Sequence, residues 1–339
     1  MLKVGLIGCG FMGAMHANCY KNIEGVEIAA VADVRREKAE ELAKGTNAAI
    51  YGDGSELIEN ADLDIIDICL PTHLHAKYAL MAMDKVGYVF VEKPVALTAQ
   101  EGRAMLEKSK TTGCQVQVGQ VIRFWDEYVE LKRIIESGTY GKVINANFRR
   151  ISPRPTWGWE NWLLDHKRSG GAAQDLHIHD VDYVLSLFGE PKRFYSIKNC
   201  KGEKNSYVNT LMQYDDFVVG LEGTWDLPGS YPFTATFRVT FEKAVVENAG
   251  GKFLMYDENG VHKIEIEKKA ITEDSYKGGN ISDLGGYYNE LLYFCNKASK
   301  GEKIEKATLA DGVSSLEFLI KELNFVIFSQ PNGLEPATF

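Results

Sequence analysis

The chain has no long hydrophobic run and few cysteines. No apolar stretch approaches the roughly 18–20 residues of a membrane-spanning helix, so we expect no membrane partner. The six cysteines among 339 residues are scattered, with no C-x-x-C pair and no metal-ligand spacing. They are typical of small buried side chains in a reducing compartment. Met1 leads directly into a predicted strand, without the basic segment of a signal peptide. We therefore expect a cytoplasmic protein without a metal.

Positive charge is also scarce. Lys and Arg number 38 against 47 Asp and Glu, which gives a net charge of −9. This balance argues against a nucleic-acid partner, although it is compatible with a local basic pocket for phosphates. A length of 339 residues is typical of two domains, and a hydrophobic content of 45% is enough for sizeable cores.

A glycine turn between a strand and a helix opens the chain. Residues 2–7 form an apolar run, and Gly8, Gly10 and Gly13 follow in a G-x-G-x-x-G pattern before a helical segment. In this context the glycines permit a tight turn, close approach to a pyrophosphate, and close packing of helix on strand. Asp33 ends the next strand, twenty residues past Gly13, where its carboxylate can accept from ribose hydroxyls. The pattern predicts a dinucleotide site rather than a plain structural turn.

Strands and helices alternate over the first 120 residues. Strands are predicted at 2–7, 27–32, 48–51, 64–70, 88–92 and 115–118, and helices at 14–20, 35–44, 75–86 and 99–112. Thr98 and Glu101 have the spacing of a capping box at the last of these helices. Alternation of apolar strands with helices indicates a doubly wound parallel sheet, whose ligand binds at the carboxyl ends of the strands.

The pattern changes beyond about residue 140. Longer strands of alternating polarity are predicted at 143–151, 192–199, 207–214, 217–225, 233–241 and 244–246, with helices at 174–188, 284–299 and 309–328 and a loose tail at 331–339. This indicates an α+β domain with a large, mostly antiparallel, open-faced sheet. We therefore predict an α/β Rossmann domain over 1–121 and a substrate-binding and oligomerisation domain over 122–339, whose last helix can pack back on the first.

Two polar positions stand out as candidates for proton transfer. Asp175 and His179 are four residues apart on a predicted helix, so they share one face, and a carboxylate there can orient an imidazole and favour its charged form. An ordinary surface ion pair has the same spacing. His177 lies on another face and is interpreted as structural. Lys93 follows the fifth strand, where an ammonium can stabilise an alkoxide, although a solvated lysine is the alternative.

Further residues can line the same crevice. Thr72 and His75 follow the fourth strand and can meet the cofactor, while His75 can equally cap or pack its helix. Arg154, Trp157 and Trp162 precede a glycine pair, and Arg123 follows the sixth strand. Aromatic faces beside a guanidinium suit a sugar ring, whereas core packing is the alternative for each tryptophan.

Together these residues resemble the glucose–fructose oxidoreductase / inositol dehydrogenase (Gfo/Idh/MocA) family. The resemblance rests on Gly8–Gly13, Glu92-Lys93-Pro94, Arg123-Phe124, 169–182 and 307–312. It implies a catalytic Lys93, an orienting Asp175 and His179 as general acid/base. The family position of His177 is often glycine, so a bulkier side chain here can alter the pocket floor or reach the substrate.

The resemblance also implies a cofactor and a reaction. The expected cofactor-binding residues are Gly8, Gly10, Phe11, Met12, Gly13, Asp33, Leu70, Thr72, His75, Glu92 and Lys93. The expected substrate-binding residues are Arg123, Arg154, Trp157 and Trp162. NAD is favoured because Asp33 would repel a 2′-phosphate, while Arg35 and Arg36 keep NADP open.

The expected activity is hydride transfer between nicotinamide and a secondary alcohol or ketone of a sugar, sugar derivative or inositol-like polyol. The alternatives are a redox-neutral NAD-dependent glycosidase, a non-catalytic NAD-binding sugar sensor, and a reductase of a non-sugar carbonyl or imine. A homodimer or homotetramer through the C-terminal sheet is implied.

Overall fold

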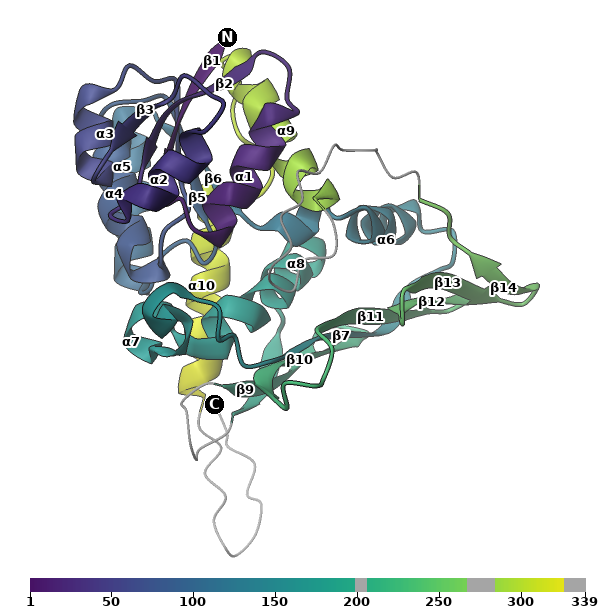
Figure 1. The fold of residues 1–339 in the computed structure, drawn as a ribbon. Helices are drawn as coiled ribbons and strands as arrows, with labels where there is room; N and C mark the ends of the chain where they lie inside the picture. Colours follow the sequence, from purple (N-terminus) through teal and green to yellow (C-terminus); the bar gives the residue numbers. More distant parts are fainter. Residues whose placement is uncertain (199–205, 267–283, 326–339) are drawn as a thin grey trace, which may run out of the picture.

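Two β-sheets organise the computed structural model, which describes residues 1–198, 206–266 and 284–325 (Figure 1). The first sheet contains β1 (Leu2–Ile7), β2 (Val26–Ala32), β3 (Ala49–Tyr51), β4 (Ile65–Ile68), β5 (Tyr88–Glu92) and β6 (Gln115–Gly119). Its strands are all parallel in the order β3-β2-β1-β4-β5-β6. The order reverses between β1 and β4, so the predicted doubly wound Rossmann sheet is confirmed.

Helices cover both faces of this sheet (Figure 1). They are α1 (Phe11–Lys21), α2 (Arg36–Ala43), α3 (Gly54–Asn60), α4 (His75–Ala82) and α5 (Ala99–Thr112), with a 3₁₀ turn at Thr72–Leu74. The capping box at α5 is confirmed, since the Thr98 side chain accepts from Glu101 N–H and the Glu101 side chain accepts from Thr98 N–H. The sequence reading missed α3, whose start is capped by Asp53 within a turn-like Asp-Gly-Ser segment.

In the part of the chain that the structure describes, the second sheet has eight strands. They are β7 (Val143–Pro153), β8 (Arg193–Lys198), β9 (Tyr207–Gln213), β10 (Val218–Leu227), β11 (Thr234–Phe241), β12 (Ala244–Ala249), β13 (Lys252–Asp257) and β14 (Gly260–Lys263). Their order is β14-β13-β12-β11-β7-β10-β9-β8, with β7 and β10 parallel and the other pairs antiparallel. The predicted mostly antiparallel sheet is confirmed; β13 and β14 were missed because short hairpin strands carry a weak signal.

The remaining helices lie between and beside the sheets (Figure 1). They are α6 (Asp126–Ser137), α7 (His166–Ser169), α8 (Ile178–Phe188), α9 (Gly285–Ser299) and α10 (Leu309–Asn324), with 3₁₀ turns at Val121–Phe124 and Trp159–Leu164. The predicted helix 174–188 is in fact a π-helical segment, Ala173–His177, followed by α8. The ends of the predicted strand 192–199 and helix 309–328, and the tail 331–339, lie outside the described residues.

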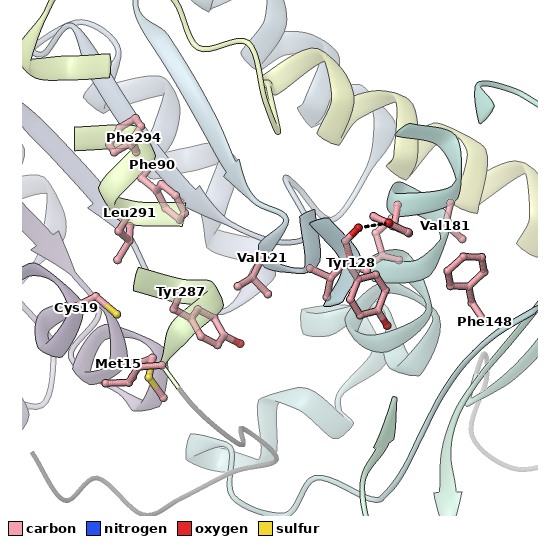
Figure 2. Packing of buried hydrophobic residues seen from close by; sticks show 14 of the residues in the cluster. Met15, Cys19, Phe90, Val121, Tyr128, Phe148, Val181, Tyr287, Leu291 and Phe294 are labelled. Carbon is pink, nitrogen blue, oxygen red and sulfur yellow. Dashed lines mark hydrogen bonds between the residues drawn. The ribbon is translucent and has the colours of Figure 1, made fainter. Parts of the chain in front are cut away.

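Both C-terminal helices pack on the first domain. α9 lies against α1, and α10 lies against both α5 and α8. Figure 2 shows Phe90 of β5 beside Leu291 and Phe294 of α9, and the Phe90 and Phe294 ring centroids are 5.4 Å apart. The buried cluster continues through Tyr128 into the second domain. Among the described residues, no helix combines the length and hydropathy of a membrane span.

Candidate active site

One cavity of about 540 Å³ collects most of the predicted site residues. The glycine turn after β1 and the ends of β2, β4 and β5 line one side of it, and the segment after β7 and the π-helical segment line the other. Predicted residues that line it are Gly8, Gly10, Phe11, Met12, Asp33, Leu70, Glu92, Lys93, Trp157, Trp162, Asp175 and His179. The cavity therefore lies at the carboxyl ends of the parallel strands, where ligands of doubly wound sheets bind.

The glycine turn fits a dinucleotide pyrophosphate. Gly8 has φ +97°, and a methyl group on Gly13 would lie 1.9 Å from the Gly8 oxygen, so both positions require glycine. A methyl group on Gly10 would meet only Arg35 Nη2, at 3.5 Å, which leaves the backbone approachable from the cavity. No side chain caps the start of α1, so a phosphate is a suitable partner for this helix end.

Asp33 is held in place beside the turn. Its Oδ2 accepts from Cys9 N–H at 2.8 Å, and its Oδ1 accepts from Arg35 N–H at 2.8 Å. The Arg35 guanidinium donates to both oxygens at 3.1 Å and lies 4.8 Å from the Trp159 ring. Arg36 instead pairs with Glu40 on the surface. Of the two arginines, Arg35 is therefore the one placed to meet the ribose end of a cofactor.

Lys93 and Asp175 join the two domains. Lys93 Nζ donates to Asp175 Oδ1 at 2.8 Å and to the Asp175 main-chain oxygen at 2.9 Å. Both side chains are largely buried, with 17% and 18% exposed. Among the described residues no hydrogen bond joins Asp175 to His179, and the Asp175 carboxylate is instead engaged by Lys93, so the orienting role of Asp175 stays a prediction.

His179 lies in the first turn of α8, just after the π-helical segment that contains Asp175. The Nδ1 atom of His179 is buried and has no hydrogen-bond partner among the described residues. Burial, with the positive charges of Lys93 and Arg150, holds the pKa of His179 well below its usual value. The ring is therefore neutral at neutral pH, opposite to the expected stabilisation of its charged form.

Residues after β4 shape the cavity more than they line it. His75 is 1% exposed, and its ring nitrogens lie 2.8 Å from the Pro94 oxygen and 2.7 Å from the Leu70 oxygen. Thr72 is 2% exposed. Neither residue is among the cavity-lining set, which includes their neighbours His73 and Leu74. The position of His75 thus matches the alternative in which it packs its helix. Its imidazole connects the loops that follow β4 and β5.

Arg123 does not line the cavity. Its guanidinium donates to both oxygens of Asp182, at 2.6 and 2.7 Å, and to Asp311 at 3.2 Å. The expected substrate contact is therefore replaced by a buried connection between α8 and α10. Arg154 is also absent from the cavity lining and lies 3.6 Å from Asp226.

His177 occupies the core rather than the pocket floor. It is 0% exposed, its Nε2 lies 3.5 Å from Glu322 Oε2, and a methyl group on Gly223 would lie 2.7 Å from its Cβ. This buried position matches the interpretation of His177 as a structural residue and does not match the alternative that it contacts the substrate.

Sequence reasoning missed Arg150, Tyr287 and Trp225, which also line the cavity. Arg150 is 2% exposed and pairs with Asp180 through two bonds of 3.1 Å. These residues lie on a strand or helix interior, where the local pattern shows only burial, so no sequence signal marks them.

Comparisons with known proteins agree with this architecture. Residues 2–120 match the model of an oxidoreductase family with an NAD-binding Rossmann fold (GFO_IDH_MocA), and residues 128–247 match the GFO/IDH/MocA C-terminal domain. A scyllo-inositol 2-dehydrogenase (NAD(+)) of Bacillus subtilis is 29% identical over 331 residues, covering 95% of this chain and 93% of the relative. A myo-inositol 2-dehydrogenase of Thermotoga maritima is 32% identical over 194 residues, but the match spans only 56% of this chain and 55% of the relative.

A solved structure shows the same fold. Levoglucosan dehydrogenase, in complex with NADH and levoglucosan, superimposes with a TM-score of 0.80 at 21% identity. The match covers 95% of this chain and 96% of that one.

Proposed function

The chain belongs to the Gfo/Idh/MocA family of NAD-dependent oxidoreductases, and we propose that its substrate is a secondary alcohol, or the matching ketone, of a sugar, sugar derivative or cyclic polyol. The observation that carries the proposal is the position of Lys93, Asp175 and His179 on the same cavity as the glycine turn. The glycosidase and sensor alternatives are not favoured, because the named relatives are dehydrogenases.

Each of the three residues has a distinct part in the proposed reaction. His179 takes the hydroxyl proton, since its lowered pKa keeps the ring neutral and able to accept. Lys93 donates from Nζ to the same oxygen and stabilises its developing negative charge. Asp175 holds Lys93 through two oxygens. NAD, when bound, supplies the hydride acceptor.

The cofactor has a matching set of proposed contacts. We propose that Gly8, Gly10 and Gly13, with Phe11 and Met12 at the start of α1, hold the pyrophosphate. In this proposal Asp33 accepts from the adenosine ribose. The Arg35 guanidinium occupies both Asp33 oxygens, so in this proposal it moves aside when the ribose binds.

Near the nicotinamide end, we propose Leu70 and Glu92 as cofactor contacts. Trp157 and Trp162 are the proposed aromatic surfaces for the substrate ring, and Trp157 already contacts Phe11 with ring centroids 5.2 Å apart.

The open face of the second sheet supports a homo-oligomer. Tyr195, Ile197 and Leu211 are 50–65% exposed on β8 and β9, and alternate residues of these strands are buried against the helices. We propose that this face forms the dimer or tetramer contact, so Leu211→Glu should lower the mass measured by sedimentation. The described cysteines are all free thiols, which supports a reducing compartment such as the cytoplasm.

The proposed activity is tested by the absorbance of reduced nicotinamide. Purified protein with NAD or NADP is offered inositols, aldoses, sugar acids and sugar alcohols, and His179→Ala is the matched inactive variant. We expect reduction of NAD with one polyol class and its loss in the variant. Silence across the panel, with NAD binding shown by calorimetry, would contradict the proposed substrate class. Normal turnover by His179→Ala would contradict its role.

A further inference from the structure

A buried imidazole connects α1, the helix that begins at the glycine turn, to β5, the strand that Lys93 follows. His16 lies on α1, three residues after Gly13, and is 0% exposed. Its Nδ1 lies 2.8 Å from Asp67 Oδ2 on β4, and its Nε2 lies 3.1 Å from Glu92 Oε1 on β5. One ring thus bridges two carboxylates from neighbouring strands.

The Glu92 carboxylate continues this connection toward the cavity. Its second oxygen, Oε2, accepts from the main-chain N–H of Lys93 at 3.1 Å. A methyl group on Gly119 of β6 would lie 3.0 Å from Glu92 Oε1, so the carboxylate is enclosed by the adjacent strand. Glu92 is 4% exposed and lines the cavity together with Lys93. Movement of this carboxylate would therefore move the backbone of Lys93.

Between two ionised carboxylates, the hydrogen-bond geometry of His16 calls for a doubly protonated ring. A carboxylate accepts only, so each ring nitrogen must donate, and both donors exist together only in imidazolium. Burial alone would lower the pKa of His16, but Asp67 and Cys69 outweigh it and hold that pKa well above the usual value. Two buried carboxylates without this cation would carry a large desolvation cost.

Polar and titratable side chains from α1, α9 and the end of β4 surround the imidazole. Tyr20 OH donates to Asp67 Oδ2 at 2.9 Å, and Cys69 Sγ lies 3.2 Å from His16 Nδ1. Cys19 on α1 and Tyr287 and Glu290 on α9 also face the cluster. Burial and the nearby Glu92 raise the pKa of Glu290 well above its usual value, which favours its uncharged form.

We propose that His16 is a positioning residue for Lys93, acting through the Glu92 carboxylate. The imidazole fixes Glu92, and Glu92 fixes the backbone from which the Lys93 side chain reaches Asp175. Because His16 is on the helix that begins at the glycine turn, the phosphate end of the cofactor site and the catalytic lysine share one rigid connection. The inference rests on the proposed catalytic role of Lys93.

Variants separate positioning from simple stabilisation. His16→Gln and Glu92→Gln should each lower kcat by roughly 10- to 100-fold, the loss expected when a reacting group is displaced by about 1 Å. In His16→Gln the NAD dissociation constant should stay near the wild-type value, since the glycine turn and the proposed cofactor contacts are untouched. The double variant should be no slower than either single one, because both act through the same bond.

Tyr20→Phe is the matched control. It removes a bond to the same Asp67 oxygen from an equally buried side chain, and among the described residues no hydrogen bond joins Tyr20 to Glu92. We expect it to lower the melting temperature and leave kcat unchanged. Independent, multiplicative losses in His16→Gln and Glu92→Gln would overturn the proposal, as would a wild-type kcat in folded Glu92→Gln.

The charge of the ring is read directly, without turnover. In protein labelled with ¹⁵N at histidine, both His16 nitrogens should show imidazolium shifts between pH 6 and 8. Glu92→Gln should shift the Nε2 resonance and so assign it even if His16→Gln does not fold. A neutral His16 ring in the wild-type protein would overturn the inference. Full activity in Lys93→Met would instead refute the proposed function, which keeps the two failures distinct.

Discussion

Lys93 holds Asp175 through two of its oxygens, the carboxylate Oδ1 at 2.8 Å and the main-chain oxygen at 2.9 Å. Asp175 lies in the π-helical segment Ala173–His177, and Lys93 directly follows β5. Since Lys93 belongs to the first domain and Asp175 to the second, the bond also fixes how the two sides of the cavity face each other.

Replacing Lys93 tests its proposed electrostatic role. We expect Lys93→Met to reduce kcat by roughly 10²- to 10³-fold, the size of effect seen when one donor to a developing oxyanion is lost. Cofactor affinity should change little. Steady-state kinetics and calorimetry measure the two effects, with exposed Lys85→Met as the control. Retained kcat in a folded Lys93→Met enzyme would remove Lys93 from the mechanism.

The pH dependence should follow the His179 ring. Its pKa lies well below the usual 6.5, because of burial and the charges of Lys93 and Arg150. The neutral base therefore persists down to that lower value, and alcohol oxidation should decline only below about pH 6.5. The pKa of His179 is lower in the folded chain than in the unfolded chain. Its contribution to the free energy of unfolding is therefore fully present above the unfolded pKa and is lost as the pH falls through the folded pKa.

A profile of kcat/KM against pH measures this decline of activity at acidic pH. In Lys93→Met one positive charge is gone, so the His179 titration followed by NMR should move to higher pH. A titration at or above 6.5 in the wild-type protein would contradict the neutral-base assignment.

Asp33 and Arg35 should control the choice of cofactor in opposite directions. Asp33→Ala removes the acceptor for the ribose hydroxyls, and we expect NAD binding to weaken by roughly 10- to 100-fold, the equivalent of a lost charge-assisted hydrogen bond. Arg35→Ala should reduce NADP binding and spare NAD. Calorimetric titration of both cofactors decides between them; an unchanged NAD to NADP ratio in Asp33→Ala would count against Asp33.

Arg123 should matter for stability rather than for substrate binding. Arg123→Ala leaves Asp182, which is 0% exposed, without its main cationic partner. We expect a loss of about 3–5 kcal/mol in the free energy of unfolding, measured in denaturant. Arg133→Ala, which breaks the surface pair with Glu130, should leave the unfolding midpoint unchanged. A large rise in the substrate KM without destabilisation would restore the substrate-contact expectation.

The sequence predicts more of the fold than of the contacts in the site. Glycine spacing, apolar strand runs and the Thr98 capping box depend on residues close together in the chain, and each of these features is present. Short elements such as α3 and β14 escaped because few residues carry their pattern. Those lining residues that follow the parallel strands could be named because strand ends in a parallel sheet meet at one edge.

Local spacing failed where partners come from distant elements. His16 joins Asp67 and Glu92, which are 51 and 76 residues away, and no periodicity in α1 indicates either partner. Arg123 likewise pairs with Asp182 on a distant element, which local spacing does not indicate.

The sequence by itself determined the dinucleotide turn, the parallel sheet and the position of Lys93 at a strand end, because backbone sterics and side-chain periodicity are local properties. Only the tertiary structure decided that Asp175 binds Lys93, and that burial with the charges of Lys93 and Arg150 holds the pKa of His179 well below its usual value. Those outcomes depend on the packing of segments far apart in the chain, which determines the direction and distance between their side chains.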